Sequence, residues 1–206
     1  MPSRSKRVFF GDYVFFVDCD VYEPAEDSFL FAENLDVKAG ESVLDMGTGS
    51  GLLGVLAANK GASVVSVDVN PHALRCAKSN AALNDTRSNM DFVQSDLFRS
   101  FRETVKFDVI LFNAPYLPTE GTEGDTLLEK AWSGGKSGRQ VIDKFISDAP
   151  KHLKPKGRIL LLQSTLSNIN ETERKFKENG LHTSIVAERS LPFFETIALL
   201  KITFCP

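Results

Sequence analysis

The amino-acid sequence predicts an α/β fold built on a seven-stranded, mostly parallel sheet with helices on both faces and an antiparallel edge. Short apolar segments alternate with helical segments along most of the chain, which is typical of parallel strands joined by crossover helices. The segment Phe107–Phe112 is apolar at nearly every position, as expected for a central strand buried on both faces. The chain then ends in two consecutive strand-like segments, which predict the antiparallel edge.

The first 40 residues predict a short N-terminal extension ahead of the first strand of this sheet. Val8–Phe10 and Tyr13–Asp18 are aromatic, strand-like segments on either side of a Gly-Asp turn, a pattern typical of a β-hairpin. Ala25–Asn34 is predicted to be a helix, because Pro24 stands at its start and proline favours the first helical position.

Seven further segments predict the strands of the sheet, and four segments predict the main helices. The predicted strands are Ser42–Met46, Ser63–Val67, Asp91–Gln94, Phe107–Phe112, Arg158–Leu162, His182–Glu188 and Glu195–Phe204. The predicted helices are Gly51–Asn59, Pro71–Leu83, Gly138–Ala149 and Ser167–Asn179. Gly180 follows the last helix, where glycine favours termination. Leu117–Ser137 is a long polar loop, and such loops in compact domains usually serve function. Arg139 is expected at the surface, where it meets either an acidic partner or only water, and His152, which shows no partnering pattern, is also expected at the surface.

Length and composition fit one domain over residues 1–206, with 42% hydrophobic and 25% charged residues. The net charge of −3 argues against a partner bound mainly through phosphate contacts. Cys19, Cys76 and Cys205 are widely spaced, so we expect neither disulfides nor a metal site, and a reducing compartment. No apolar segment approaches the roughly 20 residues of a membrane span. We therefore expect a cytoplasmic protein without membrane contact that could also enter the nucleus.

A glycine-rich turn follows the first strand of the predicted sheet. Gly47, Gly49 and Gly51 allow a tight turn and a close approach of ligand to backbone, next to the unpaired N–H groups of a helix N-terminus. Gly49–Gly54 also matches the dinucleotide fingerprint G-x-G-x-x-G. The carboxylate of Asp45, however, would repel a pyrophosphate and suits a ligand with a cationic amino-acid end. The glycines alone leave open a dinucleotide site, a site for such a cationic ligand, or a turn without a ligand.

Polar side chains also end the next three predicted strands. Asp68, Asp96 and Asn113 stand at the ends of the second, third and fourth strands, and ligands of open α/β sheets bind outside these carboxyl ends. Asp68 can accept hydrogen bonds from both ribose hydroxyls, and Asp96 can accept one from an adenine amine. Taken singly, each Asp also fits a helix cap or a surface charge. The ordered set, together with Asp45, fits S-adenosylmethionine.

Several motifs resemble those of class I S-adenosylmethionine-dependent methyltransferases, and more narrowly the eukaryotic and archaeal release-factor glutamine N5-methyltransferases (HemK-like). The superfamily motifs are the turn 45–51, Asp68, Ser95–Phe98 and Asn113–Tyr116, and the family-specific segments are 21–28 (VYEPAEDS) and 131–139 (AWSGGKSGR). The resemblance covers nearly the whole chain. It implies a Rossmann-like fold, S-adenosyl-L-methionine as cofactor, and an extension (residues 1–40) that covers the cofactor site.

The residues expected to bind the cofactor are Ser28, Asp45, Gly47, Gly49, Gly51, Asp68, Asp96, Leu97 and Asn113. Ser28 and Leu97 enter this set through the resemblance alone. Glu26, Asp27 and Ser28 also have a simpler interpretation, in which they cap and charge the first turn of a helix.

The segment Asn113-Ala114-Pro115-Tyr116 is the candidate catalytic tetrapeptide. An amide nitrogen is a poor nucleophile, because its lone pair is delocalised into the carbonyl. Two acceptors that hold both of its N–H groups would localise the lone pair and aim it at a sulfonium methyl group. The candidate acceptors are the side-chain oxygen of Asn113 and the carbonyl of Ala114, with Pro115 fixing the backbone and Tyr116 stacking on the amide. Ala114 stands where the family usually has proline, which keeps the carbonyl but removes a constraint on Asn113.

The resemblance implies two protein partners. One is the substrate, a class 1 translation release factor with a Gly-Gly-Gln motif, and the other is a small zinc-binding activator subunit that forms a heterodimer. We expect the activator to add a strand along Met90–Gln94, which normally lies at a sheet edge in this fold. The alternative is that Phe92 packs under a helix and the edge stays solvated. An adenine-N6 methyltransferase of nucleic acid, a non-catalytic cofactor-binding scaffold and an NAD-dependent enzyme are the alternatives. The acidic balance of the chain counts against the first of these.

Overall fold

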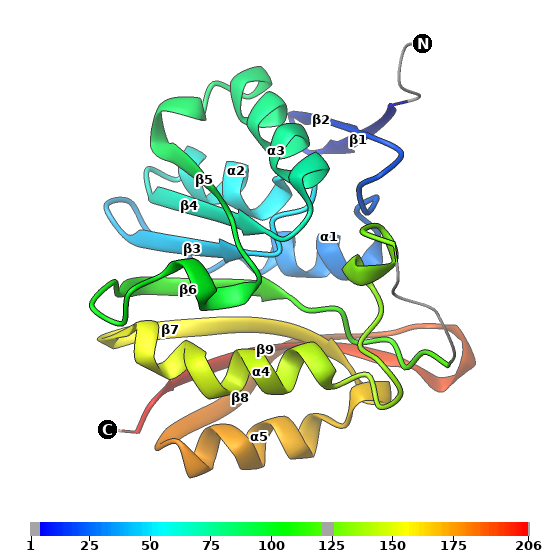
Figure 1. Ribbon diagram of the computed structural model, residues 1–206, viewed down its shortest axis with the longest axis vertical. Coiled ribbons are helices and arrows are strands. Elements are labelled where there is room, and N and C mark those ends of the chain that lie inside the picture. The colour runs from blue at the N-terminus through cyan, green and yellow to red at the C-terminus, as the bar shows by residue number, and fades with distance from the viewer. Residues whose placement is uncertain (1–4, 121–125, 206) are drawn as a thin grey trace.

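The computed structural model describes residues 5–120 and 126–205 and confirms the predicted fold class (Figure 1). The strands of the main sheet are β3 (Ser42–Met46), β4 (Ser63–Asp68), β5 (Met90–Gln94), β6 (Phe107–Asn113), β7 (Leu153–Ser164), β8 (Leu181–Ser190) and β9 (Thr196–Phe204). They form seven strands in the order β5-β4-β3-β6-β7-β9-β8. The pairs from β5 to β7 are parallel, and β9 pairs antiparallel with both β7 and β8. Of the domain expected over 1–206, residues 1–4, 121–125 and 206 lie outside the described residues.

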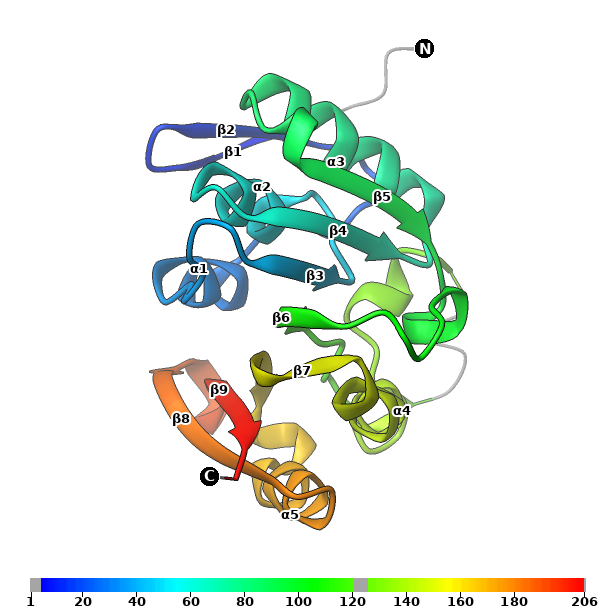
Figure 2. The same ribbon diagram turned by 90° about the vertical axis from the view of Figure 1, so that its left-hand side faces the viewer.

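Helices cover both faces of this sheet. The α-helices are α1 (Glu26–Glu33), α2 (Leu52–Asn59), α3 (Pro71–Leu83), α4 (Gln140–Asp148) and α5 (Ile169–Glu178). The 3-10 helices are η1 (Arg87–Asn89), η2 (Leu97–Ser100), η3 (Glu129–Ala131), η4 (Ala149–His152), η5 (Thr165–Ser167) and η6 (Pro192–Phe194). Figure 2 shows α1, α2 and α3 on one side of the sheet and α4 and α5 on the other. Within the described residues, none of the helices has the length and apolar character that a membrane span requires.

The hydrophobic core lies on both faces of the central strands. Val109, Ile110 and Leu111 of β6 are fully buried, as their continuous apolar pattern predicts for a strand between two helical layers. Phe31 of α1 and Phe145 of α4, which come from opposite helical layers, are also fully buried. The central strands of the sheet are therefore shielded on both sides.

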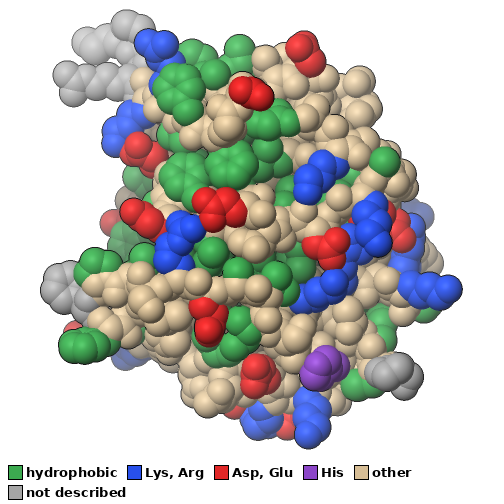
Figure 3. All heavy atoms as spheres, turned by 180° about the vertical axis from the view of Figure 1, so that it is seen from behind, with side chains coloured by type: hydrophobic (Ala, Val, Ile, Leu, Met, Phe, Trp, Pro, Cys, Tyr) green, Lys and Arg blue, Asp and Glu red, His purple; other side chains and the backbone are tan. Residues whose placement is uncertain are grey.

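An N-terminal hairpin of β1 (Lys6–Phe10) and β2 (Tyr13–Val17) packs on α3 through side-chain amides. Asn80 of α3 accepts the N–H of Phe16 at 2.9 Å and donates to its carbonyl at 2.9 Å. The Asn80 side chain also donates to the carbonyl of Ser50 at 2.8 Å. One buried amide thus joins the hairpin, α3 and the glycine turn. Viewed from behind, hydrophobic side chains gather over the half of the molecule that carries the hairpin (Figure 3).

Many predicted elements differ from the structure by one or more residues at their ends, and two of these boundary differences have a clear physical cause. β7 begins at Leu153 rather than at Arg158, because pairing with Phe107 across a register shift recruits a segment whose own sequence is polar. α5 begins at Ile169 rather than at Ser167, because the side chain of Asn168 caps it by accepting the N–H of Glu171 at 3.2 Å. Sequence periodicity does not encode either boundary. The start of β7 depends on its partner strand, and the start of α5 depends on a single capping side chain.

Arg139 and His152 are both buried, so the expectation that they lie at the surface is wrong. The guanidinium of Arg139 donates to the carbonyl of Asn168 at 2.7 Å and to Asp143 at 2.8 Å, so it ties α4 to the start of α5. The ring of His152 stacks on Phe98, with 4.7 Å between the ring centroids. Each residue has partners that are distant in sequence, which explains why no local pattern revealed them.

The amide of Asn80 should contribute measurably to stability. We expect Asn80→Ala to lower the free energy of unfolding by roughly 2–4 kcal/mol, because it leaves the N–H and carbonyl of Phe16 and the Ser50 carbonyl without their partner. Urea denaturation followed by circular dichroism measures the change. Ser79→Ala, at the exposed neighbouring position on the same helix, is the matched control and should change stability by less than about 0.5 kcal/mol. Equal effects of the two substitutions would contradict this role of Asn80.

Candidate functional site

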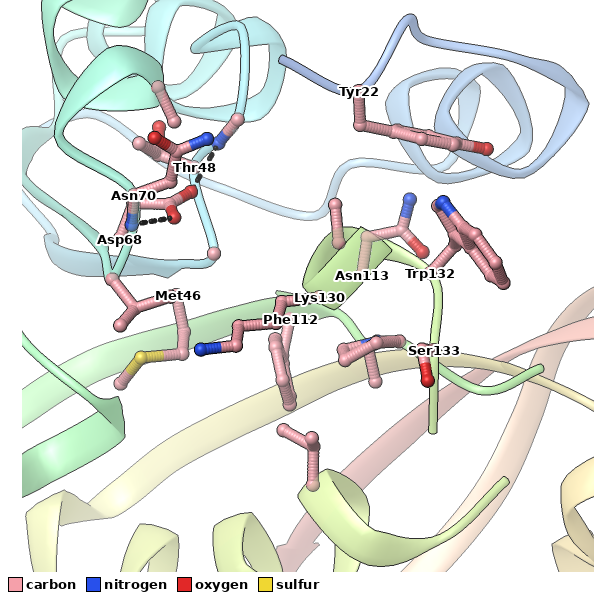
Figure 4. A pocket seen from close by; sticks show the side chains of 18 of the residues that line it. Tyr22, Met46, Thr48, Asp68, Asn70, Phe112, Asn113, Lys130, Trp132 and Ser133 are labelled. Carbon is pink, nitrogen blue, oxygen red and sulfur yellow. Dashed lines mark hydrogen bonds between the residues drawn. The ribbon is translucent and has the colours of Figure 1, made fainter. Parts of the chain in front are cut away.

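A cavity of about 640 Å³ opens at the carboxyl ends of the parallel strands, where open α/β sheets place their ligands. Figure 4 shows it between the glycine turn, the ends of β4 and β6, and the segment that carries Lys130 and Trp132. The predicted site residues that line it are Ser28, Asp45, Gly47, Gly49, Asp68, Asp96, Leu97, Asn113, Ala114, Pro115 and Tyr116. The fold therefore gathers into one cavity residues that are spread over most of the chain.

The glycine turn has the backbone conformation that its sequence predicts. Gly47, Gly49 and Gly51 have φ angles of 66°, 54° and 87°, in the left-handed region that favours glycine. Gly51 does not line the cavity, because it lies behind the turn, where an added Cβ would be 2.9 Å from the Cα of Ala77. Its contribution is close packing of the turn against α3. Gly47 and Gly49 are the two predicted glycines whose backbone faces the cavity.

Asp68, at the end of β4, fixes the position of the turn. One carboxylate oxygen accepts the N–H of Gly49 at 3.0 Å, and the other accepts the N–H of Asn70 at 2.9 Å, contacts that can be followed in Figure 4. Burial raises the pKa of Asp68 above its usual value. Each oxygen can accept further hydrogen bonds, so Asp68 can hold the turn and receive hydroxyl groups of a ligand at the same time.

Asp45 is almost completely buried beneath the turn. Its carboxylate accepts the hydroxyl of Thr48 at 2.6 Å, and an added Cβ on Gly54 would lie 2.8 Å from it. Burial raises the pKa of Asp45 to about 6, against the opposing effect of the Thr48 hydrogen bond. A cationic group of a ligand would favour the ionised form, so this carboxylate is suited to binding one. Gly54, the last glycine of the apparent dinucleotide fingerprint, lets α2 approach Asp45 closely.

Asp96 and Leu97, at the start of η2 just after β5, also line the cavity. Asp96 is solvent-exposed and lies 3.2 Å from the guanidinium of Arg99. Leu97 has a φ of 51°, an uncommon conformation for leucine of the kind that is often found at functional sites. Both residues line the cavity, as the sequence predicts.

The side-chain amide of Asn113 lies at the end of β6, and its nitrogen and oxygen have different surroundings. Its nitrogen donates to the carboxylate of Asp27 at 3.0 Å and to the hydroxyl of Ser28 at 3.3 Å. Its oxygen is buried and has no hydrogen-bond partner within the described residues. Figure 4 shows the amide between Tyr22 and Trp132, with the nitrogen toward the Tyr22 side. The site thus holds an unsatisfied acceptor, and buried acceptors are normally paired.

The rest of the tetrapeptide is held firmly by neighbouring strands and loops. The N–H of Ala114 donates to the carbonyl of Leu162 in β7 at 3.3 Å. Tyr116 is buried, and its hydroxyl lies 3.5 Å from the Asp27 carboxylate. Burial and the negative charge of Asp27 raise the pKa of Tyr116. An added Cβ on Gly138 would lie 2.3 Å from the carbonyl of Tyr116, so glycine is required there.

The long loop after the tetrapeptide is clamped at its two ends. Leu117 donates through its N–H to the carbonyl of Trp132 at 3.1 Å and accepts the N–H of Gly134 through its own carbonyl at 2.8 Å. The hydroxyls of Thr119 and Ser133 lie 2.7 Å apart. The segment 117–137 is expected to fold over the site, and its described ends line the cavity. Residues 121–125 of this expectation lie outside the described residues.

Sequence reasoning missed Asp27 as a site residue, along with Tyr22 and Lys130. The simpler interpretation of Asp27 is a charge in the first turn of α1, yet its carboxylate faces the cavity and also accepts the hydroxyl of Tyr22 at 3.2 Å. The family-specific segment 21–28 was the available signal, because it contains both Tyr22 and Asp27. No local pattern, however, could show that Asp27 meets Asn113.

Comparisons with known proteins show the family to which the chain belongs. The family model of the methyltransferase small domain matches residues 24–190. A provisionally named protein N5-glutamine methyltransferase of Methanocaldococcus jannaschii is 47% identical over 183 residues, covering 87% of this chain and 90% of that protein. Human methyltransferase HEMK2 is 34% identical over 195 residues, covering 89% of this chain and 90% of that protein.

A solved structure is also similar at the level of both sequence and fold. It is a chain of the E. cuniculi Mtq2–Trm112 complex, which is described as responsible for the methylation of the eRF1 translation termination factor. The TM-score is 0.71 at 28% sequence identity, and the match covers 90% of this chain and 99% of that chain.

Cofactor affinity should depend on pH through Asp45. A cationic ammonium group near Asp45 stabilises the ionised carboxylate, whose pKa is about 6 without it. We therefore expect the affinity for S-adenosylmethionine to be highest near pH 7 and to fall below pH 6, by at most about tenfold per pH unit. Isothermal titration calorimetry between pH 7 and pH 5 measures this change.

Asp45→Asn is the matched control for this titration. It keeps the size of the side chain but removes its charge, so binding should be weaker at pH 7 and nearly constant over the same range. An affinity of the unaltered chain that does not change with pH would contradict the assigned contact between Asp45 and a cationic group.

Proposed function

The chain belongs to the methyltransferase small domain family and uses S-adenosylmethionine as its methyl donor, and on this basis we propose that it methylates the side-chain amide of a glutamine in a class 1 translation release factor. The observation that carries this proposal is the buried, unpaired side-chain oxygen of Asn113, a residue that lines the cavity at the end of β6. An acceptor in that position is suited to a substrate nitrogen that still carries hydrogens. Family membership leaves no place for the NAD-dependent alternative.

The donor and acceptor groups of the cavity fit the parts of S-adenosylmethionine. Asp68 retains acceptor capacity for the ribose hydroxyls, and Asp96 faces the cavity where an adenine amine could donate to it. The buried carboxylate of Asp45, which accepts the hydroxyl of Thr48 in the glycine turn, suits the cationic amino-acid end of the cofactor. The bound cofactor supplies an electrophilic sulfonium methyl group. The backbone of Gly47 and Gly49 offers the close approach that the ligand requires.

The tetrapeptide supplies the groups that act on the substrate amide. The Asn113 oxygen and the Ala114 carbonyl accept its two N–H groups, hold the nitrogen in line with the methyl group and favour a localised lone pair. Tyr116 provides the aromatic surface beside the planar amide. The substitution of alanine for the usual proline is compensated, because the N–H of Ala114 is bonded to Leu162, a bond that proline could not make. The backbone after Asn113 is therefore anchored to β7.

A protein substrate is supported by the surroundings of the cavity. A second cavity of about 740 Å³ shares Val21, Tyr22 and Trp132 with the first, so it could receive residues that flank the target glutamine. The names of the relatives point the same way. The archaeal relative is named for glutamine N5-methylation, and the E. cuniculi complex for methylation of a termination factor.

We further propose that β5 is the docking edge for a small zinc-binding activator subunit. Within the described residues, β5 is an edge strand that pairs with β4 alone. The N–H of Ser95 donates to the carbonyl of Asp68 in β4 at 3.1 Å, so strand alternation directs the N–H of Gln94 away from β4. The side chain of Phe92 is partly exposed and lies 5.1 Å from the guanidinium of Arg87. The pairing of Mtq2 with Trm112 in the E. cuniculi structure supports such a heterodimer.

The substrate assignment is tested by incubating the chain, with and without a candidate activator, with labelled S-adenosylmethionine and either a release factor or DNA. We expect label on the release factor, and its loss when the glutamine of the Gly-Gly-Gln motif is replaced. Label that appears only on DNA would overturn the proposal. Asn113→Ala should abolish transfer while cofactor affinity, measured by calorimetry, stays within a few-fold of the original. Full transfer by this variant would contradict the assigned role of Asn113.

The docking edge is tested with Gln94→Pro, which removes an outward N–H and leaves the pairing of β5 with β4 intact, because proline is tolerated on edge strands. We expect the activator, co-expressed and purified as a heterodimer, to bind this variant roughly 2- to 12-fold more weakly, the equivalent of one hydrogen bond. Gln94→Ala keeps the N–H and is the matched control. A chain that is monodisperse and fully active without a zinc-binding subunit would refute the activator proposal.

A further inference from the structure

The Asp27 carboxylate lies in the wall of the cavity and accepts hydrogen bonds from several residues. One oxygen accepts the N–H of Ser28 at 2.6 Å and its hydroxyl at 3.1 Å. The other accepts the side-chain nitrogen of Asn113 at 3.0 Å and lies 3.5 Å from the hydroxyl of Tyr116. The hydroxyl of Tyr22 lies 3.2 Å from both oxygens. Every partner of this carboxylate is a donor, and Asp27 is 6% exposed.

These contacts distinguish the two possible orientations of the Asn113 amide. In the observed orientation, the nitrogen donates to Asp27, and the oxygen is buried without a partner among the described residues. Rotating the amide by 180° would place the oxygen against the carboxylate, and two acceptors without a hydrogen between them repel. The same rotation would present an N–H₂ group to the substrate. A substrate amide nitrogen that carries its own hydrogens could not donate to that group.

We propose that Asp27 is a positioning residue, whose carboxylate holds the Asn113 amide with its oxygen toward the substrate nitrogen. The inference deepens the proposed function and rests on it for the identity of that substrate. Asp27 itself does not contact the reacting atoms. It acts through Asn113, and Ser28, Tyr22 and Tyr116 hold its carboxylate in place.

The fixed donor in this network is the backbone N–H of Ser28. It determines how the amide introduced by Asp27→Asn would be oriented. A backbone N–H cannot rotate away, so the amide introduced at position 27 keeps its oxygen on Ser28 and turns its nitrogen toward Asn113. The hydroxyls of Tyr22 and Tyr116 can rotate and accept from that nitrogen. The Asn113 amide must then invert to offer its oxygen to the amide at position 27. The acceptor is thereby withdrawn from the substrate although the side-chain volume is almost unchanged.

A reciprocal exchange of the two residues tests this mechanism. We expect Asp27→Asn to lower kcat about 100-fold, the loss typical of a misplaced reacting group, with little change in the KM for S-adenosylmethionine. Asn113→Asp should also be impaired, because it sets two carboxylates against each other. In the double variant, the amide nitrogen at position 27 donates to one oxygen of the carboxylate at position 113, and the other oxygen faces the substrate. Its kcat should exceed that of either single variant by about tenfold.

The matched control is Glu26→Gln, which removes a negative charge from the neighbouring position of α1. Glu26 is exposed, and its side chain does not line the cavity. This variant should keep kcat within about twofold of the original, because surface changes away from a site have small effects. Thermal melting of all variants separates a loss of folded protein from a loss of turnover.

Each outcome of these experiments either supports or contradicts one of the two proposals. A kcat of Asp27→Asn near that of the unaltered chain overturns the positioning role, as does a double variant no faster than either single variant. The unfolding free energy gives a reading that needs no substrate, since the double variant should be more stable than Asn113→Asp alone. If the unaltered chain does not methylate a release factor, the proposed substrate fails. The stability comparison still decides whether the Asn113 amide donates to the carboxylate of Asp27, as proposed.

Discussion

Parallel pairing of β4, β3 and β6 is the constraint on which the site depends. Met46, the last residue of β3, pairs with Val67 of β4 on one side and with Phe112 of β6 on the other. The residues that follow these three positions are Gly47, Asp68 and Asn113. A shared register at the three strand ends therefore sets the glycine turn, the Asp68 carboxylate and the Asn113 amide at one level. A shift of one residue in any pair would direct its side chain to the other face of the sheet.

The polar groups around the cavity differ in how fully they are satisfied. Asp45 and Asp68 each accept hydrogen bonds from the turn that they support, so their charges are partly stabilised before any ligand arrives. The nitrogen of Asn113 is also satisfied, while its oxygen is not. An unpaired buried acceptor costs stability, and its natural explanation is a substrate that supplies the missing donor. These polar groups of the site are thus already hydrogen-bonded before a ligand binds, except for the side-chain oxygen of Asn113.

The N-terminal segment completes a site that the sheet alone leaves open. Asn80 ties the hairpin to α3 and to the carbonyl of Ser50 in the glycine turn, which brings the segment 18–28 across the strand ends. Asp27 and Ser28 then meet Asn113 in the cavity wall. The same segment supplies Tyr22, whose raised pKa reflects burial beside Asp27. The N-terminal extension therefore contributes both acceptors that hold the nitrogen of the Asn113 amide.

The sequence by itself determined the α/β alternation, the glycine turn and the order of Asp45, Asp68, Asp96 and Asn113, because periodicity and strand-end position are local properties of the chain. Only the tertiary structure revealed that Gly51 packs against Ala77 instead of facing the cavity, and that Arg139 is buried between α4 and α5. It also paired Asp27 with Asn113, which are 86 residues apart in the chain. The physical reason is that hydrogen bonds between distant segments form only once the layers have packed. Their partners leave no periodic trace in the sequence.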